Sequence, residues 1–440
     1  MKILLVGNGA REHAIAEAVA RSPQKPGLYA FMTAKNPGIS RLSEKTGIGD
    51  ICNPRDVLEF AGETGIDIAV IGPEAPLDAG VVDELEDDGI PCVGPRRNAA
   101  KLETDKSFAR RLMGKYGIEG TPKFGIFSDA DEAAGFFKES NDEWVIKPVG
   151  LTGGKGVKVM GEHLNTPDDA EGYVREVLGK DNEVVIEEKL IGEEFTIQAF
   201  VDGTTVLGSP MVQDHKRAYE GDVGPNTGGM GSYSDRGYIL PFLTQDDYDQ
   251  GIGIMQSVVD AVRKETSTAY KGFLYGQFIA TSRGLYVVEF NARFGDPEAM
   301  NVLPLLRSDF VDICTRVADG TLNELDGLKF EPKATVCKYM VPEGYPEQPK
   351  SNVKVDVDED KIKELGGRVY YASVSEEEGT IYTSSSRAIA VVGAADSIYE
   401  AEKIAEGSME YIHGELFHRK DIGTRELIKK RIEHMKSIRK

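Results

Sequence analysis

The stretch Glu289-Phe290-Asn291-Ala292-Arg293-Phe294-Gly295-Asp296-Pro297-Glu298 decides how this 440-residue chain is interpreted. It follows an apolar run at 285–288. In a strand alternate side chains share a face, so Glu289, Asn291 and Arg293 would project together while Val288, Phe290 and Ala292 pack behind them. Mg²⁺ accepts carboxylate and amide oxygens, and an arginine fork binds anions. The pattern predicts that a metal and an anionic group meet at this strand end, unless the strand merely has a solvated polar face.

Glycine marks the ends of two predicted strands in the first hundred residues. Apolar runs at 3–6 and 68–71 alternate with amphipathic stretches, which is typical of a doubly wound parallel sheet with ligand sites at the carboxyl ends of its strands. The string Gly7-Asn8-Gly9-Ala10-Arg11-Glu12-His13 leads into a helix whose free N–H groups can receive a phosphate. It lacks the third glycine of the dinucleotide fingerprint, so no nicotinamide or flavin site is expected. A plain βα turn is the alternative, and the loop Gly72-Pro73-Glu74 is open to the same two interpretations.

A glycine-rich loop lies in the central part of the chain. A β-prone run ends at Lys147, and the loop that follows contains Gly153, Gly154, Lys155 and Gly156. Such glycines let backbone amides approach phosphate oxygens closely. No Walker A motif can be drawn across the loop, and by itself it is equally typical of a hairpin turn.

Two further strings concentrate polar residues. The first is Gln213-Asp214-His215-Lys216-Arg217, and the second is Gly224-Pro225-Asn226-Thr227-Gly228-Gly229-Met230-Gly231. The cations can neutralise phosphate charge, and the glycine loop can offer backbone amides to a small carboxylate. A charged surface loop is the alternative.

Composition argues against several classes of function. The formal net charge of -21 disfavours nucleic-acid and anionic-membrane partners. The four cysteines lie far apart without a Cys-x-x-Cys pair, so we expect buried thiols rather than a zinc site or disulfides. The apolar start breaks at Gly7 and turns charged at Arg11, so neither a secretory signal nor a membrane span is predicted. We expect a cytoplasmic chain that is a monomer or a weak dimer.

The region after about residue 330 changes character. It contains β-rich segments and a helical stretch near 397–412, which indicates a small α+β domain packed on the others. The basic tail after Arg425 is predicted to be a final amphipathic helix rather than a nucleic-acid-binding arm, because the chain as a whole is acidic.

Taken in order along the chain, these strings resemble the phosphoribosylamine–glycine ligases of the ATP-grasp superfamily. The resemblance implies an amino-terminal substrate-binding α/β domain at 1–103, an ATP-grasp domain at 104–328 with a lid subdomain at about 121–190, and a carboxyl-terminal α+β domain at 329–440. It implies ATP and Mg²⁺ (or Mn²⁺) as cofactors, and glycine and 5-phosphoribosylamine as substrates joined through glycyl phosphate in purine biosynthesis. Another carboxylate–amine ligase, a biotin carboxylase, a formate-using purine synthetase, or a silent nucleotide-sensing module would be the alternatives.

The resemblance also implies a role for individual residues. The metal ligands would be Glu289 and Asn291, and the catalytic residues Lys147, Asp214 and Arg293. The nucleotide would contact Lys106, Lys147, Gly153, Gly154, Lys155, Gly156, Glu187, Glu188, Lys189, Leu190 and Glu194. The other substrates would contact Asn8, Gly9, Arg11, Glu12, Gly72, Pro73, Glu74, Asp214, His215, Lys216, Arg217, Asn226, Thr227, Gly228, Gly229, Met230, Arg293, Gly295 and Asp296.

Overall fold

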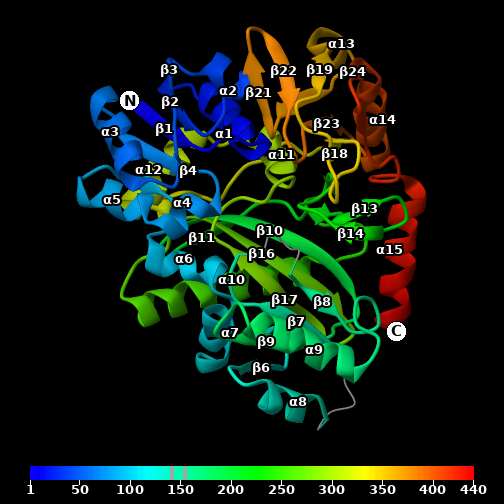
Figure 1. Ribbon diagram of the computed structural model, residues 1–440. Helices are drawn as coiled ribbons and strands as arrows, with labels where there is room; N and C mark the ends of the chain where they lie inside the picture. The colour runs from blue at the N-terminus through cyan, green and yellow to red at the C-terminus, as the bar shows by residue number, and fades with distance from the viewer. Residues whose placement is uncertain (139–142, 152–155) are drawn as a thin grey trace.

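The structure is a computed structural model that describes residues 1–138, 143–151 and 156–440 (Figure 1). Its amino-terminal part is a five-stranded parallel sheet in the order β3-β2-β1-β4-β5, which confirms the predicted doubly wound sheet. The strands are β1 (Lys2–Val6), β2 (Gly27–Met32), β3 (Lys45–Ile48), β4 (Ile68–Ile71) and β5 (Cys92–Val93). The helices are α1 (Ala10–Ala20), α2 (Pro37–Leu42), α3 (Pro54–Thr64), α4 (Glu74–Ala79), α5 (Val81–Asp87) and α6 (Arg97–Thr104).

The central part contains two antiparallel sheets. The larger has the order β11-β10-β16-β17 and the smaller β6-β9-β7-β8. Their strands are β6 (Phe124–Phe127), β7 (Trp144–Pro148), β8 (Lys158–Val159), β9 (Val184–Glu188), β10 (Glu193–Asp202), β11 (Val206–Gly208), β16 (Lys271–Thr281) and β17 (Gly284–Asn291). The helices are α7 (Lys106–Lys115), α8 (Ala130–Lys138), α9 (Pro167–Leu178), α10 (Gln245–Thr266), α11 (Ala299–Val302) and α12 (Phe310–Asp319).

The carboxyl-terminal sheet borrows two strands from the central part. Its main path is β12-β15-β18-β23-β20, and a smaller sheet has the order β21-β22-β19-β24. The strands are β12 (Gln213–Asp214), β15 (Gly231–Ser234), β18 (Ala334–Pro342), β19 (Lys354–Val357), β20 (Arg368–Tyr371), β21 (Val374–Glu377), β22 (Thr380–Thr383), β23 (Ile389–Ala395), β24 (Ile412–His413) and β25 (Leu416–Phe417). The helices are α13 (Glu359–Glu364), α14 (Ile398–Ser408) and α15 (Arg425–Ile438), and the predicted final helix is thereby confirmed. Because β12 and β15 join this sheet, the polar string at 213–217 lies against the carboxyl-terminal part.

Local sequence explains where the elements that carry the site begin. The Asp105 side chain accepts the Phe108 N–H at 2.9 Å, so α7 starts at Lys106. Thr244 and Asp247 form a capping box at the start of α10. The helix α10 then buries Met255 and Val258 against the larger central sheet.

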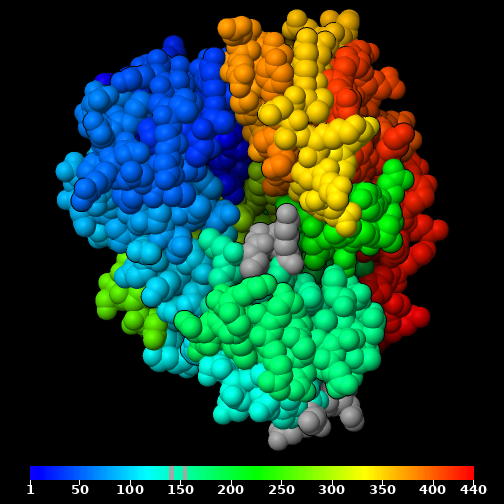
Figure 2. Space-filling view, viewed as in Figure 1, coloured from blue at the N-terminus to red at the C-terminus, as the bar shows by residue number. Residues whose placement is uncertain are grey.

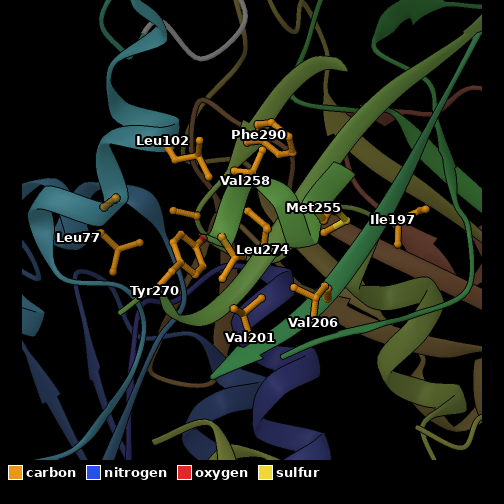
Figure 3. Packing of buried hydrophobic residues seen from close by; sticks show 14 of the residues in the cluster. Leu77, Leu102, Ile197, Val201, Val206, Met255, Val258, Tyr270, Leu274 and Phe290 are labelled. Atoms are coloured by element: carbon orange, nitrogen blue, oxygen red, sulfur yellow. The ribbon is translucent and has the colours of Figure 1, made fainter. Parts of the chain in front are cut away.

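One apolar core spans the amino-terminal and central parts (Figure 3). It includes Leu77 and Leu102 from the amino-terminal helices and Ile197 and Leu274 from the larger central sheet. Each fully buried aliphatic side chain contributes about 1.5–3 kcal/mol. A shared core of this kind holds the two parts in a fixed relation.

Two details differ from expectation. Three cysteines are buried as predicted, but Cys52 is only half-buried, because it lies in a turn before α3. Strand β17 ends at Asn291, so Arg293 lies in the turn that follows rather than on the strand, where the sequence had placed it. No helix in the described part of the chain is long and apolar enough to cross a membrane.

Candidate active site

Charged residues from all three parts of the chain line one cavity of about 360 Å³. Arg11 comes from the amino-terminal part, Lys147 and Glu289 come from the central part, and Arg387 comes from the carboxyl-terminal part. In the space-filling view the three parts meet around a recess near the middle of this face (Figure 2). A second cavity of about 580 Å³ shares Lys147, Glu289 and other residues with the first, so the two form one cleft.

Strand β17 brings the two expected metal ligands to the cleft. Glu289 and Asn291 both line the first cavity, and Phe290 and Ala292 are almost fully buried, as the alternation predicted. Val288, which was expected to pack behind the strand with them, is only half-buried and lines both cavities. The Glu289 side chain remains 35% exposed, and the nearest cation, Lys216 Nζ, is 3.7 Å away. Burial raises the pKa of the Glu289 carboxyl, but Lys216 and neighbouring lysines outweigh burial and lower it below its ordinary value. The carboxylate is therefore ionised and only loosely paired.

Lys147 is fixed between the two central sheets. Its Nζ lies 2.7 Å from Glu187 Oε2 and donates to the Val288 carbonyl at 3.0 Å. Arg110 donates to both Glu187 oxygens, at 2.6 and 3.0 Å. Burial alone would raise the pKa of Glu187, but Arg110 and Lys147 together bring it to about 2. Glu187 thus holds Lys147 in place and has no free oxygen for a ligand.

Arg293 is held by two carboxylates. Its Nε donates to Glu74 Oε2 at 3.1 Å, and an η nitrogen lies 3.1 Å from Glu103 Oε1. Glu103 also accepts the Ala292 N–H at 2.6 Å. The pKa values of the two carboxyls are shifted in opposite directions. Burial raises the pKa of Glu103 to about 7. Burial would also raise the pKa of Glu74, but Arg293 and Arg11 outweigh it and lower that pKa to about 2. No motif marked Glu103 in the sequence.

The turn before α1 differs from the expected phosphate site. Glu12 folds back so that its carboxylate accepts the Gly9 N–H at 2.6 Å and the Arg11 Nε–H at 2.5 Å. One helix-start N–H is therefore already used, and the buried negative charge opposes an anion. The Gly9 N–H is thus taken, and the expected phosphate at this turn stays a prediction; Arg11 itself lines the first cavity. A Cβ at Gly72 would lie 2.2 Å from Glu12 Oε1, which explains the glycine.

An acidic pair, the half-buried Asp214 and the buried Glu298, lies beside the glycine loop at 224–231. Asp214 and Glu298 line the first cavity, and burial together with the Glu298 charge raises the pKa of Asp214 well above its ordinary range. The Tyr275 hydroxyl donates to Glu298 at 2.8 Å. Gly229 has φ of +115°, and a Cβ there would lie 2.6 Å from Asp214 Oδ1, so only glycine fits.

Arg387 joins this loop to the carboxyl-terminal part. It donates to the carbonyls of Gly228, Gly229 and Asp296 at 2.8, 3.1 and 2.8 Å. Arg387, Tyr275 and Glu298 were missed by sequence reasoning. The place of Glu298 in the motif at 289–298 was a signal that could have identified it. Arg387 is far in sequence from the other residues of the site, so no local pattern marked it.

The second cavity contains most residues expected to contact the nucleotide. Its wall includes Glu187, Glu188, Lys189, Leu190 and Glu194, together with Asn226 and Arg217. Lys189 Nζ is 2.7 Å from Glu143 Oε2, and Gln277 donates to Glu194 at 2.5 Å. Lys106 lines the first cavity and donates to the Gly150 carbonyl at 2.8 Å. The Gly156 carbonyl accepts the Tyr173 hydroxyl, and Gly153, Gly154 and Lys155 lie outside the described residues.

Several other expected site residues lie in or behind the walls. Pro73, Asp214, Lys216, Thr227, Gly228 and Asp296 line the first cavity. Neither cavity is lined by Asn8, Gly9, Glu12, Gly72, Gly229, Met230 or Gly295. Met230 is fully buried in the core. His215 is buried too, stacks on Tyr233 and places Nδ1 3.5 Å from Asp222.

Comparison with known proteins shows which family the chain resembles along its length. Models of the phosphoribosylglycinamide synthetase N domain, ATP-grasp (A) domain and C domain match residues 1–103, 104–299 and 335–425. Curated proteins called phosphoribosylamine–glycine ligase from Methanocella arvoryzae and Methanosarcina barkeri are 54% and 55% identical over 439 and 440 residues, covering 100% of both chains.

Solved structures show the same architecture. The phosphoribosylamine–glycine ligase from Thermotoga maritima has a TM-score of 0.81 and 28% identity, covering 96% of this chain and 100% of its own. The biotin carboxylase domain of Hydrogenobacter thermophilus 2-oxoglutarate carboxylase, solved with MgADP, has a TM-score of 0.70 at 17% identity and covers 99% and 93%. That second likeness shows the fold alone. From the domain models and the full-length relatives, the chain belongs to the phosphoribosylglycinamide synthetase family.

Proposed function

We propose that this chain joins glycine to 5-phosphoribosylamine at the expense of ATP and gives glycinamide ribonucleotide, ADP and phosphate in de novo purine biosynthesis. The observation that supports this most directly is the cleft itself. Arg11, Lys147 and Arg387, which line it, come from three different parts of the chain. Full-length relatives more than half identical carry the corresponding name.

The proposed reaction has two steps. The glycine carboxylate attacks the γ-phosphorus of ATP, so that ADP leaves and glycyl phosphate forms. The neutral amine of phosphoribosylamine then attacks the acyl carbon, loses a proton, and phosphate leaves as the amide forms. No conventional general base is required, because the amine is nucleophilic when neutral. Catalysis is then mainly positioning and charge stabilisation.

The first step brings two anions together, and the residues around Glu289 suit that task. Lys216, Lys147 and Lys106 all lie close enough to lower the pKa of Glu289, so cations face this carboxylate within a cleft whose walls also carry many acidic side chains. In the described part of the chain no group of three or more His, Cys, Asp or Glu residues could hold a metal. Mg²⁺ or Mn²⁺ can be held by one or two protein ligands beside phosphate oxygens. Held by Glu289 and Asn291, the ion would neutralise phosphate charge.

Glycine would bind beside the acidic pair. The raised pKa of Asp214 reflects crowded negative charge in a buried place, and the ammonium group of glycine would relieve it. The backbone around Thr227 and Gly228 would face the carboxylate end. We place phosphoribosylamine on the side of Arg11, Glu74 and Arg293, with Arg293 as the residue that orients it.

The test measures ADP release with ATP, glycine and phosphoribosylamine, each omitted in turn. We expect sustained release only with all three, together with formation of glycinamide ribonucleotide. Release supported by bicarbonate or formate in place of glycine would instead favour another carboxylate-activating reaction. Nucleotide binding without turnover on any substrate would favour a sensing module.

We also propose that the enzyme works in the cytoplasm as a monomer or weak dimer, without nucleic-acid or membrane partners. Its charge of -21 supports the last point. Sedimentation at several concentrations would test the oligomeric state, and a stable tetramer would contradict it.

A further inference from the structure

The C-terminal helix α15 reaches from the carboxyl-terminal part to the second cavity (Figure 1). Its Arg431 lines that cavity and is 17% exposed. One η nitrogen lies 3.3 Å from Glu193 Oε2, and the other forms a close ion pair with Asp222. Arg431 therefore bridges two acidic residues that lie in different segments of the cavity wall.

The first of these segments is the linker into β10. Glu193 begins β10, directly before Glu194, and its side chain is only 4% exposed. His434, one turn after Arg431 on the same helix, places Nδ1 2.6 Å from the other Glu193 oxygen. Gln213 donates to the Glu194 carbonyl at 2.9 Å. Glu193 thus fixes the corner where residues 188–192, from the smaller central sheet, turn into the larger one.

The second segment is the turn that contains Asp222 and contacts the polar string at 213–217 through His215. Asp222 lies between β13 (Arg217–Tyr219) and β14 (Val223–Asn226), and it faces His215 Nδ1 at 3.5 Å. Arg419 donates to Asp222 at 3.0 Å from a side chain that is 1% exposed. Through Asp222, Arg431 helps to hold His215, which lies between Asp214 and Lys216.

Two buried atoms in this network have no hydrogen-bond partner among the described residues. They are Nε of Arg431 and Nε2 of His215, and both residues line the second cavity. A buried polar atom left unpaired costs about 1–3 kcal/mol, so such atoms are rarely kept without a purpose. Both atoms are shielded from the open cavity, so they mark a tightly packed polar network directly behind its wall.

We propose that Arg431 is a positioning residue for the nucleotide. It ties Glu193 to Asp222 and thereby sets the linker 188–194 and the string 213–217 at the spacing that ATP requires. The C-terminal helix is then part of the nucleotide site, rather than only a brace between domains. This inference rests on the proposed function only in that ATP binds in the second cavity.

The experiment compares two arginines of the same C-terminal segment. Arg439 makes a two-pronged ion pair with Asp247 at 2.8 and 2.6 Å and lines neither cavity, so Arg439→Gln is the matched control. We expect Arg431→Gln to raise the Kd for ATP about tenfold by calorimetry with no other substrate present, and to raise KM for ATP likewise. KM for glycine should rise less than KM for ATP, because Arg431 contacts Glu193 beside the nucleotide linker directly but reaches Asp214 only through Asp222 and His215, and kcat should change less than threefold. Arg431→Lys should recover part of the affinity, and Arg439→Gln should leave the Kd for ATP within twofold.

Several results would overturn the inference. One is an equal loss of ATP affinity in Arg439→Gln, which would show that only attachment of the helix matters. Unchanged ATP affinity in Arg431→Gln, or a parallel loss for every substrate, would do the same. Should Arg431→Gln not fold, Glu193→Gln and Asp222→Asn replace it and must each weaken ATP binding. A wild-type chain that binds ATP but does not ligate glycine would refute the proposed function and leave this inference standing.

Discussion

Glu187 and Glu289 lie on the walls of one cleft but in opposite states. Glu187 is 6% exposed, and Arg110 and Lys147 occupy both of its oxygens. Glu289 is 35% exposed, and its nearest cation is 3.7 Å away. Both oxygens of Glu187 are occupied by cations of the protein, whereas the oxygens of Glu289 remain available to a ligand. An acidic side chain in the cleft wall is therefore not by itself evidence of ligand binding. What matters is whether cations of the protein already occupy its oxygens.

The largest expected effect comes from Glu187→Gln, which tests whether Glu187 serves to pair the buried cations of the protein. The change leaves Arg110 and Lys147 buried with their charge uncompensated, and breaking a buried ion pair in this way costs about 3–5 kcal/mol. We expect a loss of that size in the free energy of unfolding, measured by urea denaturation. The neighbouring Glu188→Gln, which removes a pair with Arg283, should cost about 1 kcal/mol or less. Equal losses in the two variants would remove the contrast.

Glu289→Gln should show the reverse pattern. We expect turnover to fall about 100-fold or more, equivalent to about 2.7 kcal/mol, because a neutral amide binds a divalent cation poorly. The free energy of unfolding should change by about 1 kcal/mol or less, since the pair with Lys216 is loose. ATP affinity measured without metal should stay near that of the wild type. Wild-type turnover in this variant would refute the assignment of Glu289 as a metal ligand.

Glu103 lies between the two extremes and provides a pH test. It is buried like Glu187, but it shares its one cation, Arg293, with Glu74, and its pKa is raised to about 7. A carboxyl whose pKa is higher in the folded than in the unfolded state loses stability as pH rises toward the folded pKa. The wild type should therefore lose about 1 kcal/mol of unfolding free energy between about pH 6 and pH 8 relative to Glu103→Gln. Parallel pH profiles for the two proteins would show that Glu103 stays ionised.

The same contrast explains which parts of the site could be predicted from the sequence. Glu289, Asn291 and Lys147 lie in short motifs whose strand periodicity and glycines are local, and the structure places all three on the cleft wall. Arg387 comes from β-rich sequence about ninety residues beyond its partner Asp296, and no local pattern encodes that meeting. The string around His215 predicted a polar site, but it did not predict that the His215 ring would pack inward against Tyr233.

The fold was predictable for a related reason. Alternation of apolar runs and amphipathic stretches repeats within windows of about ten residues, so the parallel sheet followed from local pattern. The pairing of β15 with β18 did not, because it joins segments about a hundred residues apart. Glu12 shows the same limit at small scale. A helix-start glycine motif predicted free N–H groups for a phosphate, and no local pattern showed that the Glu12 side chain, three residues after Gly9, would take the Gly9 N–H.

The smallest expected effect comes from the pair next to Arg110. Arg111 follows it on α7 and makes a two-pronged contact with Glu183, at 2.9 and 2.5 Å, but the two side chains are 53% and 30% exposed. Solvent screens such a pair, so Arg111→Gln should change the free energy of unfolding by about 0.5 kcal/mol and leave turnover unchanged. Arg110→Gln is the companion variant, and it should cost several times more because it leaves the buried Glu187 with Lys147 as its one remaining ion-pair partner among the described residues. The free energy of unfolding of both variants would be measured by urea denaturation at low and at high salt. Salt should reduce the already small effect of Arg111→Gln and leave the effect of Arg110→Gln nearly unchanged. A large loss in Arg111→Gln that does not depend on salt would mean that burial does not distinguish the two ion pairs.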